Sequence, residues 1–265
     1  MEQTTSLLVA QLTDLHLFAR ADGDLMGLNT LASLKTVLQA LTDLDPQPQQ
    51  LILTGDLAQD ETQAAYQHLQ HLITPLKIPT YWLPGNHDHL DNLAATLINP
   101  PFSNQKSYQM GGWHFLLLDS TVQGQVYGQL SSSTLEGLDR ALKQASPHPT
   151  VIALHHPPLT IHSDWLDQIG LHNAQDFFAI LDRHAHVKLV LFGHIHQELA
   201  CQRQGIHYLS TPSTCIQFAP HSQTFALDTC DPGFRLLNLY ADGTFKTEVK
   251  RVKTHQALDL SAKGY

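Results

Sequence analysis

The chain of 265 residues contains few cysteines and few basic side chains, and each shortage excludes a class of protein. Its cysteines, Cys201, Cys215 and Cys230, lie 14 and 15 residues apart, which fits neither a zinc-site spacing nor a disulfide framework. We expect buried thiols. The 15 Lys and Arg residues form no cluster and are outnumbered by 24 Asp and Glu, which gives a net charge of −9. Because binding to a nucleic-acid backbone depends on clustered basic residues, a nucleic-acid polymer is excluded as the main partner.

Long hydrophobic runs are also missing. The first residues, "MEQTTSLLVAQL", carry no basic leader, and their only apolar run is Leu7 to Ala10. This run is too short for a signal peptide or a membrane span, so we expect a cytoplasmic protein without membrane contact. A composition of 42% hydrophobic and 15% charged residues is typical of a globular chain. The length favours a single domain over residues 1–265.

The first two-thirds of the chain alternates short apolar runs with amphipathic stretches. The runs "SLLVAQLTD", "QLILTGD", "TYWLPGN", "WHFLLLD", "TVIALHH" and "HVKLVLFGH" predict buried strands. The stretches between them predict helices: "TLASLKTVLQALTDL", "ETQAAYQHLQHLI", "SSTLEGLDRALKQA" and "NAQDFFAILDRHA". This alternation indicates an α/β sheet covered by helices.

After residue 197 the pattern changes to consecutive strands. "ELACQRQGIHYLS" is interrupted at Gln204-Gly205, and "FRLLNLYADGTFKTEVKRV" is interrupted at Asp242-Gly243, a strong hairpin signal. The simplest arrangement is a second, mostly antiparallel sheet packed on the first.

Every predicted strand of the alternating part whose end can be located stops at a polar group able to bind a metal. The groups are Asp14 and His16 in "TDLH", Asp56 in "TGD", Asn86 and His87 in "PGNHD", His155 and His156 in "LHHPP", and His194 and His196 in "FGHIHQ". In open α/β sheets, ligands bind beyond the carboxyl ends of the strands, so these groups are expected in one crevice. In the last motif the two imidazoles also emerge on the same side of an extended chain, about 7 Å apart.

Each motif alone has an ordinary structural explanation. Asp14-Leu15-His16 fits a turn or helix cap, Asn86-His87-Asp88 fits an Asx turn, and His155-His156 before two prolines fits a rigid turn. Five such motifs in order, all at strand ends, favour a functional site. Asp119 is expected to be a buried structural carboxylate or a strand-end cap, and not a metal ligand.

These five motifs resemble those of the calcineurin-like metallophosphoesterases, and none departs from the family pattern. The resemblance implies an α/β (α+β) fold, a four-layer sandwich of two mixed β-sheets flanked by helices, with a dinuclear metal site. By position, it assigns one metal to Asp14, His16, Asp56 and His196, and the other to Asp56, Asn86, His155 and His194. Asp56 is then the bridge, and His156 is structural.

The chemistry of phosphodiester hydrolysis also favours a dinuclear metal site. Two metal ions about 3.5 to 4 Å apart can clamp the oxygens of an in-line displacement and activate a water. They would also attract a phosphodiester anion to an acidic chain. Mixed nitrogen and oxygen ligands favour Fe, Mn, Zn or Co.

His87, which is left without a metal, is the predicted catalytic residue, either as general acid or as a binder of a phosphoryl oxygen. Asp88 is expected to orient His87, with closure of the turn as the alternative.

The segments "GDLMGLNT", "LSTPSTCIQF" and "DPGFRLLNLYADG" resemble the bacterial cyclic-AMP phosphodiesterases of this family. This resemblance implies hydrolysis of 3′,5′-cyclic AMP to 5′-AMP by a hydroxide that bridges the metals. Candidate substrate contacts are Asn86, His87 and Asn29, with Thr30, Ser213, Thr214 and Gln217 nearby, and Phe218 as the only obvious stacking platform. The alternatives are a glycerophosphodiesterase, another phosphodiesterase or pyrophosphatase of the same fold, and a non-catalytic scaffold. A monomer and a homodimer are both compatible with the sequence.

Overall fold

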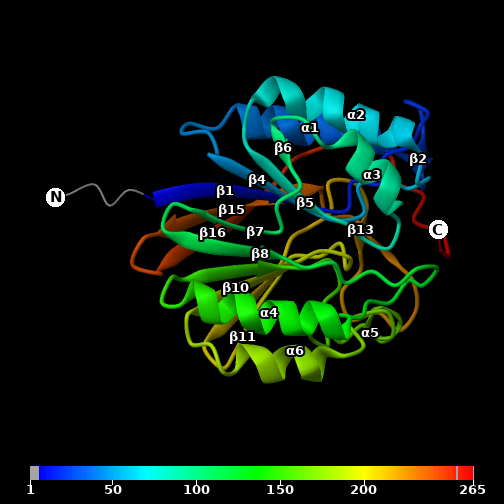
Figure 1. Ribbon diagram of the computed structural model, residues 1–265. Coiled ribbons are helices and arrows are strands. Elements are labelled where there is room, and N and C mark those ends of the chain that lie inside the picture. The colour runs from blue at the N-terminus through cyan, green and yellow to red at the C-terminus, as the bar shows by residue number, and fades with distance from the viewer. Residues whose placement is uncertain (1–5, 255, 265) are drawn as a thin grey trace.

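The computed structural model describes residues 6–254 and 256–264, in which two six-stranded sheets face each other between two layers of helices (Figure 1). The first sheet contains, in spatial order, β16 (Phe245–Arg251), β15 (Gly233–Tyr240), β1 (Ser6–Leu12), β4 (Gln50–Thr54), β5 (Thr80–Leu83) and β6 (Phe102–Ser103). The second contains β11 (Leu199–Arg203), β12 (Ile206–Ser210), β10 (Val187–Phe192), β9 (Thr150–Ala153), β8 (Trp113–Leu117) and β7 (Ser107–Met110). The expected four-layer sandwich is confirmed.

Helices cover the outer face of each sheet (Figure 1). Above the first sheet lie α1 (Thr30–Thr42), α2 (Gln63–Ile73), η1 (Thr74–Leu76) and α3 (Leu90–Thr96). Below the second lie α4 (Ser132–Ala145), α5 (Asp164–Asp167) and α6 (Ala174–Leu181). Two short pairs, β2 (Asp24–Leu25) with β3 (Leu28–Asn29) and β13 (Gln217–Phe218) with β14 (Leu227–Asp228), lie outside the main sheets.

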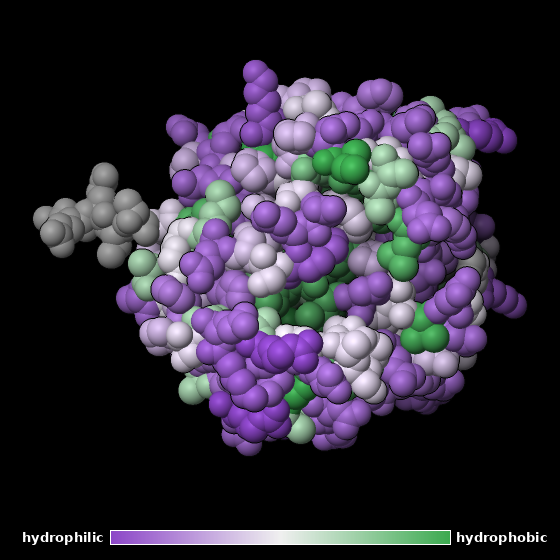
Figure 2. All heavy atoms as spheres, in the orientation of Figure 1, coloured by the Kyte–Doolittle hydropathy of each residue, from purple (hydrophilic) through white to green (hydrophobic). Residues whose placement is uncertain are grey.

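Three apolar cores hold these layers together. One joins α1 and α2 to the first sheet, another joins α4 and α6 to the second sheet, and the third fills the space between the sheets. The outside is mostly polar: the face shown in Figure 2 is largely hydrophilic, with apolar atoms in small areas and in a central hollow. Within the described residues, no helix is both long enough and apolar enough to cross a membrane.

The expected division between the sheets was wrong. The C-terminal hairpins do not form a second sheet of their own. Instead, β15 pairs antiparallel with β1 and extends the first sheet, while β12 pairs parallel with β10 and extends the second. Each parallel core has an open edge, at β1 and at β10, and each hairpin adds to one of these edges. The local sequence specifies the hairpin turn but not the edge that the hairpin joins.

Candidate metal centre

The loops that follow β1, β4, β5, β9 and β10 bring the predicted ligands together. Six of the predicted ligands are Asp14, His16, Asp56, His155, His194 and His196. Together with His87 and His156 they form four overlapping groups, and within each group the candidate ligand atoms lie within 4.8 Å of one another. All six are buried, and none exposes more than 4% of its surface. Acidic side chains need a counter-charge at such burial, so their charge must be balanced inside the cluster.

The two carboxylates lie at the centre of this cluster. Asp56 Oδ2 is 3.2 Å from His155 Nε2 and 3.7 Å from His16 Nε2, so one oxygen faces imidazoles from two different loops. Asp14 Oδ1 is 3.4 Å from His196 Nε2 and 4.0 Å from His155 Nε2. His155 therefore lies near both carboxylates, in the middle of the group.

The backbone of the cluster adopts a conformation that non-glycine residues rarely take. Five of the predicted ligands have a positive φ angle between 47° and 69°: Asp14, His16, Asp56, His194 and His196. Such residues cost of order 1–3 kcal/mol each and are found mainly at functional sites. The loops hold one another in this geometry, because His16 N–H donates to the carbonyl of Asp56 (2.9 Å) and His194 N–H donates to the carboxylate of Asp14 (3.0 Å).

Oxygen acceptors fix the orientation of three of the imidazoles. Nδ1 lies 2.6 Å from Gln59 Oε1 in His16, 2.8 Å from the carbonyl of Thr54 in His155, and 2.9 Å from the carbonyl of Ile216 in His196. These acceptors place a proton on Nδ1, so in each of the three rings it is Nε2 that faces the cluster. Metal-binding histidines are oriented in the same way by a partner on the other ring nitrogen.

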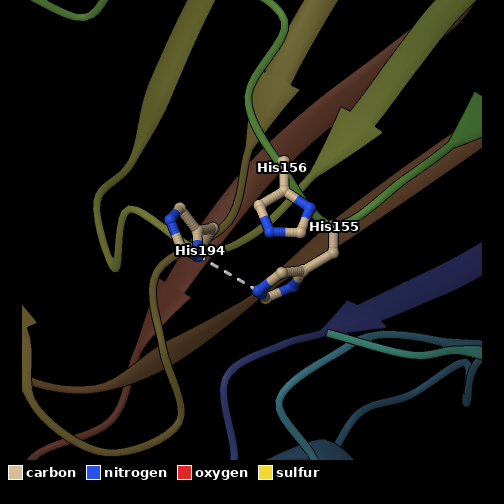
Figure 3. A group of neighbouring side chains, drawn as sticks. All are labelled: His155, His156 and His194. Atoms are coloured by element: carbon tan, nitrogen blue, oxygen red, sulfur yellow. Dashed lines mark hydrogen bonds between the residues drawn. The ribbon is translucent and has the colours of Figure 1, made fainter. Parts of the chain in front are cut away.

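At the centre of the cluster, imidazole nitrogens from different loops face each other. His16 Nε2 lies 3.1 Å from His196 Nε2, and His155 Nε2 lies 3.3 Å from His194 Nδ1. The dashed line in Figure 3 marks the second of these contacts. Asn86 Oδ1 and His194 Nε2 are buried without a hydrogen-bond partner. Converging lone pairs and an unpaired amide oxygen are what cations satisfy, so the donor set fits two metal ions with mixed nitrogen and oxygen ligands.

Charge coupling within the cluster shifts the pKa values of its groups. Burial disfavours a charged carboxylate, but His155 and His87 outweigh this effect and hold the pKa of Asp56 well below its usual range. Burial likewise disfavours protonation of His155, but Asp56 and Asp14 raise its pKa to about 9. Burial lowers the pKa of His16 to about 3, so this imidazole is neutral at pH 7 and can bind a metal directly, whereas His155 must release a proton when it binds one.

The neighbours of the cluster have separate roles. His87 is held by its backbone N–H, which donates to Asp56 Oδ1 (2.9 Å), and its ring lies edge-on to His16 with centroids 5.1 Å apart. His156 uses both ring nitrogens, at Ser120 Oγ (2.8 Å) and at the carbonyl of Val126 (3.1 Å). Figure 3 shows the His156 ring beside those of His155 and His194. These bonds fit the structural role expected of His156.

Asp88 closes the turn and does not serve mainly to orient His87. Its half-buried carboxylate accepts backbone N–H groups from Gly85, Leu57 and Ala58, as well as the hydroxyl of Tyr66. These bonds tie the turn after β5 to the loop that carries Asp56.

Asp119 is exposed and caps a turn by accepting from the backbone N–H of Thr121 (2.9 Å), so the strand-end cap is the alternative that the structure supports.

Several of the expected substrate contacts form hydrogen bonds within the protein. Asn29 caps α1: its Oδ1 accepts from Ala32 N (2.7 Å), and its amide donates to the carbonyl of Ala21. Ser213 and Gln217 are buried and bond to backbone carbonyls, including that of Asp14, to which Ser213 Oγ donates (2.7 Å). Thr30 and Thr214 are buried as well. An alternation of polar residues does not distinguish side chains that support a loop from those that line a cavity.

Three residues at the site, Gln59, Trp165 and Phe225, were not predicted from the sequence. Gln59 orients His16, and it lies three residues after Asp56 in a stretch that otherwise looks like an ordinary loop. Trp165 and Phe225 line a cavity beside Asn86 and come from segments that contain no metal motif. An isolated aromatic residue gives no signal of this kind in a single sequence.

The glycine before Asn86 is required by close packing, and this requirement can be tested. A Cβ atom at Gly85 would overlap the backbone nitrogen and Oδ1 of Asp56. We expect Gly85→Ala to lower the free energy of unfolding by about 1–3 kcal/mol and to reduce metal content, because the Asp56 loop must move. Denaturant unfolding and elemental analysis measure both effects.

Gly137 supplies the matched control. It lies in α4, where an added Cβ would approach no atom closer than 3.9 Å. Gly137→Ala is expected to retain the full metal content and to gain up to about 1 kcal/mol, since alanine is the better helix former. Wild-type stability and metal content in Gly85→Ala would contradict the packing argument.

Comparisons with known proteins agree with this geometry. A family model described as calcineurin-like phosphoesterase matches residues 7–198. The chain is 49% identical over 252 residues to a 3′,5′-cyclic-nucleotide phosphodiesterase of Nostoc sp. (strain PCC 7120), with 95% of each chain covered. It is 44% identical over 259 residues to the 3′,5′-cyclic adenosine monophosphate phosphodiesterase CpdA of Escherichia coli K12, covering 97% of this chain and 94% of CpdA. The solved structure of a dimetal phosphatase from Danio rerio shares the fold, with a TM-score of 0.66 at 15% identity, and covers 93% of this chain and 99% of its own.

Proposed function

This chain belongs to the calcineurin-like phosphoesterase family, and we propose that it is a dinuclear-metal phosphodiesterase that hydrolyses 3′,5′-cyclic AMP to 5′-AMP. The observation that carries the proposal is the buried cluster of two carboxylates and four imidazoles, whose lone pairs converge at strand ends. The choice of a cyclic nucleotide is supported by relatives of that name, which are aligned over nearly the whole chain.

The distances between side chains support two ligand sets. Asp14, His16 and His196 form one close group, and Asp56 Oδ2 lies 3.7 Å from Nε2 of its member His16. Asn86, His155 and His194 would complete the second set. His155 Nε2 faces Asp56 and His194, whereas the ring nitrogens of His156 bond to Ser120 and to the carbonyl of Val126, so His155 is the better ligand of the adjacent pair. Fe, Mn, Zn and Co all suit this donor set.

When bound, a metal pair supplies charge for the phosphodiester and lowers the pKa of a water from 15.7 to roughly 7. The chain provides the remaining functions. Asp56 accepts the backbone N–H of His87 and so fixes that residue next to His16. From this position the His87 side chain can donate a hydrogen bond or a proton to the ribose 3′ oxygen as it leaves. Asn86 and His87 line the cavity where the substrate would lie, and the low polarity of that cavity strengthens such a hydrogen bond.

His87→Ala is expected to lower kcat by about 10²- to 10⁴-fold while leaving the metal content nearly intact, because positioned proton transfer contributes a factor of this size. An ester with a good leaving group, such as bis(4-nitrophenyl) phosphate, should lose less than cyclic AMP does. Elemental analysis of the same samples reports metal content. The matched control is His71→Ala, on the exposed face of α2, which should match the wild type. Loss of metal in His87→Ala would assign that residue to the metals and not to catalysis.

The substrate assignment is tested by comparing kcat/KM for 3′,5′-cyclic AMP with that for glycerophosphodiesters. We expect 5′-AMP as the product and only modest selectivity, because the metals hold the phosphate more firmly than the base. A preference of about a hundredfold for the glycerol compound, close to 3 kcal/mol, would reject the cyclic nucleotide while retaining the phosphodiesterase chemistry.

A further inference from the structure

A cavity of about 250 Å³ opens directly beside the proposed phosphate site. It is lined by Asn86, His87 and His194, which belong to the metal motifs, and by the aromatic side chains of Trp165, Phe218 and Phe225. Among the described residues that line it, none is an acid, a lysine or an arginine. The lining thus combines polar groups of the proposed metal site with a neutral wall of aromatic rings.

The three aromatic rings form one packed unit. The ring centroids of Trp165 and Phe218 are 5.0 Å apart, those of Trp165 and Phe225 are 5.3 Å apart, and those of Phe218 and Phe225 are 5.5 Å apart, all in edge-to-face geometry. Phe218 also stacks on His196, with centroids 4.1 Å apart and an angle of 13° between the rings. The aromatic wall is therefore joined by direct contact to a predicted metal ligand.

The three aromatic side chains differ in exposure, and the difference leaves room for one ligand ring to stack on them. Phe218 is 1% exposed and forms the base of the wall, while Trp165 and Phe225 are only half-buried. The indole of Trp165 is held in place, because its Nε1–H donates to Ser222 Oγ (3.0 Å). A large aromatic face kept in one orientation beside a phosphate site resembles the platforms on which proteins stack nucleobases.

We propose that Trp165, Phe218 and Phe225 form the subsite for the purine base of the nucleotide. The proposal rests on the proposed function. The cavity is smaller than the roughly 300–1,000 Å³ typical of sites for drug-sized ligands, so it suits one ring system while the ribose and phosphate extend toward the metals. A quaternary ammonium group also binds aromatic walls. The wall contains no carboxylate to balance such a charge, which favours the neutral base.

Tryptophan fluorescence gives a readout that does not depend on turnover. The other two tryptophans, Trp82 and Trp113, are buried at 4% and 0% exposure, so only Trp165 can meet a ligand directly. In the metal-loaded protein, 5′-AMP is expected to quench the fluorescence and ribose 5-phosphate is not. Trp165→Phe should abolish the quenching and leave the emission of the two buried tryptophans.

Competition against hydrolysis of bis(4-nitrophenyl) phosphate measures the affinities. Trp165→Ala should raise the inhibition constant of 5′-AMP about tenfold or more, in line with about 1–3 kcal/mol for base stacking, and change that of ribose 5-phosphate less than twofold. Tyr240→Ala, at the far end of β15, is the matched control and should change neither constant.

Three results would overturn the subsite. The first is equal binding of 5′-AMP and ribose 5-phosphate by the wild type. The second is an unchanged 5′-AMP constant in Trp165→Ala. The third is phosphocholine that binds more tightly than 5′-AMP and depends on Trp165. If the wild type hydrolyses cyclic AMP and one of these results is found, only the subsite fails. If the wild type does not hydrolyse cyclic AMP at all, the proposed function fails.

Discussion

Replacing Asp56 by alanine is expected to remove both metal ions together and to lower kcat/KM by at least about 10³-fold. One oxygen of this carboxylate lies 3.2 Å from His155 Nε2 and 3.7 Å from His16 Nε2, between the two proposed ligand sets. Its loss therefore takes a ligand and a negative charge from each metal. Since the metals are proposed to supply several kcal/mol of charge stabilisation, losing both must cost at least three orders of magnitude.

Alanine variants of two other carboxylates serve as comparisons for Asp56→Ala. Asp14→Ala removes a ligand from one proposed set only, so the metal content should fall toward one ion per chain. Asp119→Ala removes an exposed turn cap and should leave metal content and kcat/KM unchanged. Elemental analysis of the three purified variants decides the matter. Retention of one tightly bound metal in Asp56→Ala would mean that Asp56 does not bridge.

Strong chelation is expected to abolish hydrolysis and to lower the melting temperature, and Mn or a related ion should restore both. The cluster holds two buried carboxylates, facing imidazole nitrogens and five residues with positive φ, all of which a bound cation would stabilise. A metal present at 100 times its Kd adds about 2.7 kcal/mol to the free energy of unfolding. For a chain of this size that corresponds to a shift of roughly 5–10 °C.

Calorimetry of the chelated and the reloaded protein measures this shift. Mg and Ca are the comparison ions, because a site rich in imidazole favours transition metals. Equal melting temperatures with and without bound Mn would show that the cluster is stable without a cation. That result would contradict the reading of its unpaired Asn86 Oδ1 and facing imidazoles as a metal site.

The strand and helix pattern was readable because burial imposes it on the sequence. Continuous apolar runs such as "LILTG" predicted β4, and an amphipathic period predicted α1, because both are set by contacts with a core next to the element. The partners of the C-terminal hairpins were not readable. Pairing of β15 with β1 joins residues more than 200 positions apart, and nothing in the local pattern of either strand specifies that contact.

The candidate site divides in the same way. Metal-binding side chains lie at fixed offsets from strand ends, so the motifs around Asp56 and His194 were visible in the sequence. Residues that act through tertiary contacts were not. The helix-capping bond of Asn29 was not predicted, and Trp165, which lines the cavity, comes from a segment without a motif. A polar residue at a turn can cap, support or bind, and only the packing around it decides which.

The most direct test of the central claim is to incubate the protein, loaded with two Mn ions per chain as shown by elemental analysis, with 3′,5′-cyclic AMP in ¹⁸O-labelled water. Mass spectrometry of the product identifies the bond that is broken. The proposed mechanism predicts 5′-AMP with one ¹⁸O atom in the phosphate and an unlabelled 3′ hydroxyl, because water attacks phosphorus and the 3′ oxygen leaves. Formation of 3′-AMP, label in the ribose, or no turnover by the fully loaded protein would contradict it.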